Sequence, residues 1–280
     1  MRNYVDLHTH SNVSDGQLRP AEVVRLAERK RLAAVALTDH DSADGLAEAE
    51  AAARALPIRF VRGVEISASF SGGTMHIVGL GIDPANRRLR SAMGRLVRAR
   101  QRRNPKVVAK LRAMGVDVTL EQWRAWAGDC RMVGRLHMAK LLCAKGYARD
   151  VGDAFRRYIG AGAPAFVDKE LLSPREAIEA IHAAGGLAVL AHPPELNYGS
   201  NARLERIVRS LVRDGLDGIE AIHSEHSPAQ TRHYLALAGR LGLLVSGGSD
   251  FHGPDQLDNR VGLPRVPLAA VEELLARIHC

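Results

Sequence analysis

Short apolar runs rich in Val, Ile and Leu alternate along this chain with longer stretches in which apolar residues recur at helical spacing. The first five segments are "NYVDLH", "PAEVVRLAERKRL", "AAVALTDHD", "ADGLAEAEAAARAL" and "IRFVRGVEIS", which predict strand, helix, strand, helix and strand. The alternation resumes at "SPREAIEAIHAAGG" and continues to a last helix at "PLAAVEELLARIH". With "TMHIVGLGI", about seven strands are predicted. This number favours an α/β fold with a closed or nearly closed barrel. No GxGxxG or GxxxxGK[ST] motif supports an open nucleotide-binding sheet.

The middle of the chain has a different pattern, with helical spacing, glycine stops and almost no strand signal. We therefore predict two domains: a barrel formed by residues 1–91 and 165–280, and an all-helical insertion formed by residues 92–164. Trp123 and Trp126 are three residues apart in the insertion, which favours a place in its core over a base-stacking platform.

The positive charge of the chain is concentrated in this insertion. Residues 87–157 hold 19 Lys or Arg against 5 Asp or Glu, a net charge of +14, whereas the remainder carries 20 against 26, a net charge of −6. Such a segment is either a solvated helical surface or a surface that attracts phosphorylated or nucleic-acid substrates.

Targeting signals are not evident. The chain has no run of 18 apolar residues, and "MRNYVDLH" enters a strand directly, so we expect a cytoplasmic protein that does not bind membranes. Cys130, Cys143 and Cys280 form no CxxC pair and are expected to be reduced thiols. The sequence implies no protein partner.

Polar residues that bind metals follow the predicted strands at their carboxyl ends, where the catalytic groups of parallel barrels lie. His76 lies near the start of its strand instead, but a hairpin turn at "SFSGGT" would carry it back toward Glu65. Carboxylates that cluster repel one another unless a cation lies between them, and imidazoles with carboxylates suit divalent transition metals. The pattern predicts a multinuclear metal site with the ligands His8, His10, Asp15, His40, Glu65, His76, His192, Asp250 and His252.

The segments "DLHTHSNVSDG", "LTDHD", "GVEI", "HIVGLG", "LAHP" and "GSDFHG" resemble the motifs of the polymerase and histidinol phosphatase (PHP) superfamily. The helical insertion after "HIVGLG", with "GRLHMAKLL" inside it, most resembles the branch of nucleoside 3′,5′-bisphosphate phosphatases and 5′ to 3′ exoribonucleases. This resemblance implies a distorted (β/α)7 TIM-like barrel with two or three divalent metals.

The resemblance also implies how the ligands are shared. One metal would be held by His8, His10, Glu65 and Asp250, a second by Asp15, His40 and His252, and a third by His76, His192 and a shared Glu65. Many relatives have histidine where this chain has Asp15, so manganese is favoured over zinc, and iron or magnesium also suit such ligands. Two metals about 3.5 to 4 Å apart lower the pKa of a shared water and bind the phosphoryl oxygens, so no protein nucleophile is required. The segment "GGS" before Asp250 lacks the GxSxG context of a nucleophilic serine.

His223 ends the strand "LDGIEAIH" and is a candidate substrate contact or acid for the leaving group. His137, His182, His226, His233 and His279 are interpreted as helix or surface histidines. Arginine gives bidentate phosphate contacts, so the insertion could supply a site for a second phosphate remote from the metals. Turn capping and solvated helix surface are the alternatives for the remaining candidate substrate contacts, which are Ser11, Asn12, Arg102, Arg103, Arg135 and Lys140.

The first functional hypothesis is a phosphatase that removes the 3′-phosphate from a nucleoside 3′,5′-bisphosphate such as pAp, with the 5′-phosphate held by the basic insertion. The second is a 5′ to 3′ exonuclease on short 5′-phosphorylated oligoribonucleotides, and the two are not exclusive. A histidinol phosphatase is a third hypothesis, but a monophosphate that carries its own amine does not need an insertion with a net charge of +14. A regulatory metal-binding module without activity predicts lost ligands, whereas all nine positions are filled.

Overall fold

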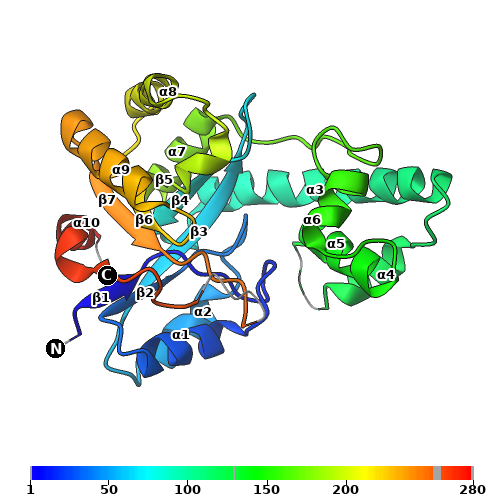
Figure 1. Ribbon diagram of the computed structural model, residues 1–280. Helices are drawn as coiled ribbons and strands as arrows, with labels where there is room; N and C mark the ends of the chain where they lie inside the picture. The colour runs from blue at the N-terminus through cyan, green and yellow to red at the C-terminus, as the bar shows by residue number, and fades with distance from the viewer. Residues whose placement is uncertain (1, 129, 131, 255–259, 279–280) are drawn as a thin grey trace. The chain divides into compact units, whose positions relative to one another are not determined.

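The computed structural model describes residues 2–128, 130, 132–254 and 260–278. Eight strands form one sheet in the order β7-β6-β5-β4-β3-β2-β1-β8 (Figure 1). These strands are β1 (Tyr4–Asp6), β2 (Ala34–Leu37), β3 (Arg59–Ala68), β4 (Met75–Leu80), β5 (Leu187–Leu190), β6 (Gly218–His223), β7 (Leu244–Gly248) and β8 (Val266–Pro267). The seven strands expected from the sequence are all present, and the sheet curls into the nearly closed barrel predicted for this fold class.

Two features of the sheet depart from a regular parallel barrel. β4 is antiparallel to both β3 and β5, because the turn after β3 reverses the chain as a hairpin. β8 was not predicted, and it pairs antiparallel with β1 at the edge of the sheet. The barrel closes between β1 and β7, where the Leu7 N–H donates to the Gly247 carbonyl at 3.1 Å and Thr9 forms a parallel bridge with Phe251. Closure at this end brings the loops after β1 and β7 together.

The barrel core consists of strand residues that are apolar on the inner face, among them Val5, Val61, Val189 and Leu244, each at most 4% exposed. The helices of this unit follow the strands in the alternating order expected from the sequence. They are α1 (Pro20–Arg29), α2 (Leu46–Ala53), α7 (Pro174–Ala183), α8 (Asn201–Arg213), α9 (Pro228–Leu241) and α10 (Glu272–Arg277), with short 3-10 turns at Pro193–Leu196 and Leu268–Ala270.

Sequence signals at the helix starts explain where several helices begin. In α7 the Ser173 hydroxyl accepts a hydrogen bond from the Glu176 N–H, and Pro174 occupies the first helical position. In α9 Ser227 and Gln230 form the same reciprocal cap. These caps satisfy backbone N–H groups that the first helical turn leaves without partners.

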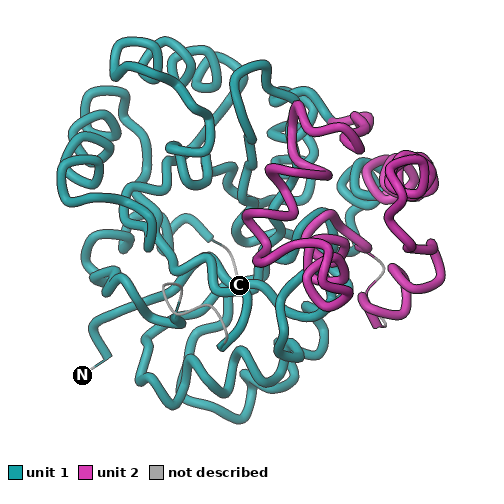
Figure 2. Tube along the Cα trace, turned by 45° about the vertical axis from the view of Figure 1, so that its right-hand side comes forward, with its two compact units in different colours: residues 1–93, 172–280 teal, residues 94–171 magenta. Residues whose placement is uncertain are grey.

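The chain divides into two compact units, Met1–Met93 with Leu172–Cys280 and Gly94–Leu171 (Figure 2). The second, which we call the helical unit, contains most of α3 (Arg87–Ala113), α4 (Leu120–Trp126), α5 (Arg135–Ala144), α6 (Val151–Ala154) and a π-helical turn (Phe155–Ile159). A function of this unit as a substrate cap, with the boundaries expected from the sequence, stays a prediction.

The helical unit has its own apolar core, which includes Leu111, Trp123, Met138 and Ile159, all fully buried. The prediction of a core position is confirmed for Trp123, whose indole N–H also donates to the Gly134 carbonyl at 3.1 Å. It is wrong for Trp126, which is 47% exposed because α4 ends there and its last turn faces solvent.

In the described part of the chain, no helix is long and apolar enough to cross a membrane. Cys130 and Cys143 are free thiols, as expected, whereas Cys280 and His279 lie outside the described residues.

Candidate metal centre

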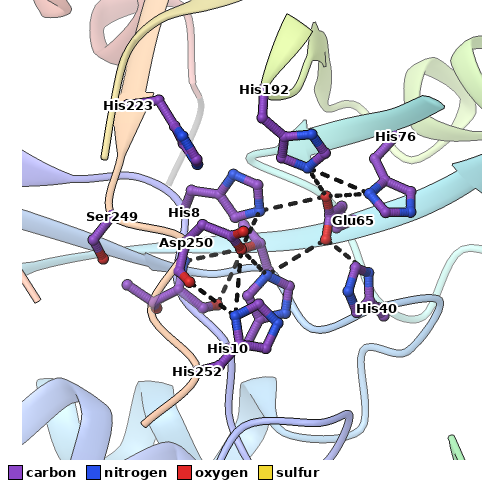
Figure 3. Close-up of polar contacts among 12 residues, drawn as sticks. His8, His10, His40, Glu65, His76, His192, His223, Ser249, Asp250 and His252 are labelled. Carbon is purple, nitrogen blue, oxygen red and sulfur yellow. Dashed lines mark hydrogen bonds and ion pairs between the residues drawn. The ribbon is translucent and has the colours of Figure 1, made fainter. Parts of the chain in front are cut away.

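The nine predicted ligands lie in overlapping groups whose ligand atoms are within 4.8 Å of one another. Figure 3 labels all of them except Asp15. Most come from the loop after a parallel strand, which is the position that a parallel barrel offers to functional groups, whereas Glu65 lies within β3 and His76 near the start of the antiparallel β4. His8, His10 and Asp15 follow β1, His40 follows β2, Glu65 and His76 lie on β3 and β4, His192 follows β5, and Asp250 and His252 follow β7.

The first group is His8, His10, Glu65 and Asp250, as the family resemblance implied. His8 Nε2 lies 3.5 Å from Glu65 Oε1 and 3.4 Å from Asp250 Oδ1. His10 Nε2 lies 3.4 Å from Glu65 Oε2 and 2.9 Å from Asp250 Oδ1. Two imidazole nitrogens and two carboxylate oxygens therefore face one small space, which suits one divalent ion.

The second group contains Asp15, His40 and His252, with His10 beside them. His252 Nε2 is 3.3 Å from Asp15 Oδ1, and His40 Nε2 is 3.8 Å from Asp15 Oδ2. The rings of His10 and His252 stack with their centroids 4.2 Å apart. The position of His10 between the first two groups was not expected from the sequence.

The third group brings His76 and His192 to Glu65. His76 Nδ1 is 2.9 Å and His192 Nε2 is 2.8 Å from Glu65 Oε1. The hairpin pairs Ser67 with His76, and since residues two apart in a strand share a face, His76 lies on the same face as Glu65. The other oxygen, Glu65 Oε2, is 2.7 Å from His40 Nδ1, so this one buried carboxylate contacts ligands of all three groups.

Several of these atoms are buried without a hydrogen bond of acceptable geometry, among them His8 Nε2, both ring nitrogens of His10, and Glu65 Oε2. Buried polar atoms without partners are costly, and metal binding would remove that cost. Burial, together with the charges of His252 and His40, lowers the pKa of His10 to about 3, which keeps this imidazole neutral and able to bind a metal. The residues present therefore fit a cluster of divalent ions.

Buried aspartates hold the loops that carry the ligands. Asp39 accepts hydrogen bonds from the Ser11 N–H at 2.8 Å and from its hydroxyl at 2.7 Å, next to His10. Asp6 accepts the same pair from Ser249, at 2.9 and 2.7 Å, next to Asp250. Burial raises the pKa of Asp6 and of Asp39 to about 6 in spite of these hydrogen bonds. Each aspartate thus fixes the backbone of a ligand on another strand.

The backbone itself is specialised beside His8. A Cβ atom added at Gly248 would lie 2.4 Å from the His8 Cβ and 2.5 Å from the His8 nitrogen, so β7 can approach His8 only because this residue is glycine. Asp250 has a φ of 51°, a left-handed conformation that costs free energy in a residue other than glycine and is enriched at functional sites.

The predicted substrate contacts of the barrel unit differ in their exposure and in their hydrogen-bond partners. Ser11 is fully buried and its hydroxyl is bonded to Asp39, so the expected substrate contact is corrected to a structural role. Ser249, which was not expected to be a nucleophile, donates its hydroxyl hydrogen bond to Asp6 at 2.7 Å. Asn12 is exposed.

His223 points toward the cluster (Figure 3), and its Nδ1 accepts the Glu225 N–H at 3.2 Å. Neutral His223 therefore carries its proton on Nε2.

The four Arg and Lys side chains of the helical unit that were predicted to contact substrate also differ in their exposure and in their partners. Arg102 is exposed and bound to Glu170 at 3.0 Å. Arg103 is 3% exposed, and its Nε donates to Asn104 at 2.9 Å. Burial, together with the charges of Arg100 and Arg135, lowers the pKa of Arg103 to about 9.

Arg135 and Lys140 are both partly buried on α5. They are five positions apart, which places their Cα atoms about 140° apart around the helix. The guanidinium of Arg135 lies 5.3 Å from the centre of the Phe166 ring.

Sequence reasoning missed two acidic residues at the centre. Glu220 on β6 is 2% exposed and contacts His8, and Glu195 Oε2 lies 3.5 Å from His192 Nδ1. Each could have been found in the sequence. Glu220 is an acid inside the apolar strand "GIEAIH", and Glu195 is an acid three residues after a ligand in "HPPE". His226 was interpreted as a helix or surface residue but lies 5.1 Å from the His223 ring centre.

Comparisons with known proteins agree with this geometry. The model of the PHP domain matches residues 6–121. A 3′,5′-nucleoside bisphosphate phosphatase of Chromobacterium violaceum is 40% identical over 98% of this chain and 97% of its own length. A 5′-3′ exoribonuclease of Haemophilus influenzae is 37% identical over 91% of this chain and 92% of its own length. The crystal structure of a metal-dependent phosphoesterase from Bifidobacterium adolescentis superposes with a TM-score of 0.88 at 31% identity, covering 99% of this chain and 96% of that one.

Proposed function

Because this chain belongs to the PHP domain family, we propose that it is a metal-dependent phosphatase that removes the 3′-phosphate from nucleoside 3′,5′-bisphosphates. The observation that carries the proposal is the gathering of nine imidazole and carboxylate ligands in groups around the buried Glu65, which itself contacts five of the imidazoles. Similarity to the Chromobacterium violaceum phosphatase along nearly the whole chain supports the choice of substrate.

Two or three divalent ions would be held by the three groups described above. Manganese is favoured because Asp15 adds a hard oxygen ligand to the second group, and zinc, iron or magnesium are compatible with the same residues. Bound ions would supply Lewis-acid activation of water and neutralise charge on the reacting phosphoryl group.

Side chains of the protein would position the metal ligands and the substrate. Glu65 holds the spacing of the groups, and Asp39 and Asp6 fix the loops. His223, with its proton on Nε2, would donate a hydrogen bond to the substrate near the leaving oxygen.

We assign the second phosphate to the helical unit, which has 17 Lys or Arg against 7 Asp or Glu, a net charge of +10. Within the described residues, no ion pair shorter than 4.0 Å involves Arg103 or Arg135, although both are at least partly buried; Asp168 is close enough to Arg135 to act on its charge without pairing with it. A buried cation without an anionic partner is unfavourable, and a phosphate would compensate it. Arg102 is less suited because Glu170 already neutralises it.

A second candidate function is 5′ to 3′ exonucleolytic cleavage of short oligoribonucleotides, favoured by the similarity to the Haemophilus influenzae exoribonuclease. The two candidate functions are distinguished by the steady-state turnover, with added Mn²⁺, of three compounds: a nucleoside 3′,5′-bisphosphate, a 5′-monophosphate and a 5′-phosphorylated dinucleotide. We expect the bisphosphate to be the best substrate and the 5′-monophosphate to be nearly inert. A dinucleotide that is turned over much faster than the bisphosphate would make the exonuclease the main function.

Replacing Arg103 or Arg135 with Ala should lower kcat/KM for the bisphosphate by roughly tenfold to a hundredfold, because a charged hydrogen bond worth about 1.5 to 3 kcal/mol is lost. Hydrolysis of a small aryl phosphate, which has no second phosphate, should change much less. Arg102→Ala serves as the matched control, since this guanidinium is exposed and paired with Glu170. Equal losses on both substrates would show that these arginines act on stability instead.

A further inference from the structure

We propose that Glu220 is a positioning residue that sets the geometry of the metal centre by binding the two candidate ligands His8 and His192 together. This inference rests on the proposed metal-dependent function. Glu220 lies on β6, which supplies none of the nine ligands, and its carboxylate is buried at 2% exposure.

The first contact orients an imidazole. Glu220 Oε1 lies 3.1 Å from His8 Nδ1. On the opposite side of the ring, His8 Nε2 faces Glu65 at 3.5 Å and Asp250 at 3.4 Å. A carboxylate that accepts the Nδ1 proton leaves the lone pair of neutral imidazole on Nε2, where the first metal group lies, and raises the basicity of that nitrogen.

The second contact fixes a loop. Glu220 Oε2 accepts the backbone N–H of His192 at 2.8 Å, just beyond the end of β5. β5 and β6 are parallel, and Leu190 pairs with Ile219, so Glu220 is one residue further along β6 where β5 has ended. From this point the His192 side chain reaches Glu65, with Nε2 at 2.8 Å from Oε1.

The two contacts link groups that belong to different metals. His8 lies in the first group and His192 in the third, and Glu65 joins them on the opposite side. His8 and His192 therefore contact a glutamate on each side. Glu65 faces a ring nitrogen of both residues, whereas Glu220 contacts the other ring nitrogen of His8 and the backbone N–H of His192. A change at Glu220 should thus alter metal affinity without removing a ligand.

His8, Glu220 and His223 could instead form a metal site of their own, since their ligand atoms lie within 4.8 Å of one another. His8 Nδ1 cannot give a proton to Glu220 and bind a metal at the same time. The two roles therefore differ in the number of metals bound: loss of a ligand removes a whole equivalent, whereas loss of a positioning residue weakens binding.

The experiment measures Mn²⁺ binding to the metal-free protein, by competition with a chelating dye, for wild type and Glu220→Gln. The amide has no negative charge and a single acceptor oxygen, so it cannot keep both the 3.1 Å contact of Oε1 with His8 and the 2.8 Å contact of Oε2 with His192. We expect the dissociation constant of the tightest Mn²⁺ to rise tenfold to a hundredfold with the number of bound ions unchanged at saturation. Activity on the bisphosphate should recover as Mn²⁺ is raised, measured at a temperature where circular dichroism shows the metal-free variant to be folded, so that stabilisation of the fold by Mn²⁺ does not explain the recovery.

Glu272→Gln is the matched control, because Glu272 is an exposed glutamate on α10. If Glu220→Gln does not fold, Glu220→Asp keeps the charge but shortens the reach by one methylene, and it should weaken Mn²⁺ binding severalfold. Unchanged dissociation constants, or loss of one whole equivalent with the other ions bound as in wild type, would overturn the positioning role. If wild type itself binds no Mn²⁺, the proposed metal-dependent function fails.

Discussion

Glu65→Gln should lose bound metal and nearly all phosphatase activity, with kcat/KM lowered by more than about a hundredfold. Residues that only support a ligand typically change activity by about 10- to 100-fold, whereas Glu65 belongs to the first and third groups and also contacts His40 of the second. The amide loses the negative charge that faces five imidazoles, and one of its two ligand atoms becomes an NH₂ group that cannot bind a cation.

Metal analysis by mass spectrometry beside steady-state kinetics checks this result, with Glu272→Gln as the exposed control. The variant must be compared at equal folded concentration, verified by circular dichroism. Full metal occupancy together with activity near that of wild type would exclude a shared ligand at residue 65.

Removing divalent ions with a chelator should abolish hydrolysis of both the bisphosphate and a small aryl phosphate. Added Mn²⁺ should restore it, because activation of water at neutral pH depends on the ions. Since ions bind the folded state, Mn²⁺ at about 100 times its dissociation constant should stabilise folding by about 2.7 kcal/mol. This corresponds to a rise in Tm of roughly 4 to 5 °C for a chain of this size.

Thermal unfolding with and without Mn²⁺ gives a readout that is independent of turnover. A metal-free protein that retains full activity, with metal content below about a tenth of an equivalent, would contradict the metal-dependent account.

The barrel and the ligand cluster could be predicted from the sequence because two strong signals coincide. Apolar runs of strand length define the sheet, and polar residues at the ends of successive runs are brought together by the geometry of a parallel barrel. The hairpin that turns His76 toward Glu65 was also predictable from "SFSGGT". β8 was not predictable, because two residues carry no periodicity.

The contacts around the ligands could be predicted less well, since they depend on which side chain faces which partner. Ser11 and Arg102 have the residue types of phosphate contacts, yet Asp39 and Glu170 already bind them. Arg103 has almost the same neighbours in the sequence as Arg102. Its side chain is nevertheless buried, because it lies one position further around α3. Glu220 was hidden in an apolar strand, where its neighbours suggest a buried residue and not its two polar partners.

The central claim is that one phosphate reacts at the metal centre while the helical unit holds the other. Binding energy from the remote phosphate can orient the reacting one, so its removal should lower turnover as well as affinity. The most direct test compares kcat/KM for a nucleoside 3′,5′-bisphosphate and for the corresponding 3′-monophosphate at low salt, with the products identified. We predict an advantage of at least about tenfold for the bisphosphate, or roughly 1.4 kcal/mol, with release of the 3′-phosphate and an advantage that shrinks as salt rises. Equal kcat/KM for the two compounds, or release of the 5′-phosphate first, would contradict the account.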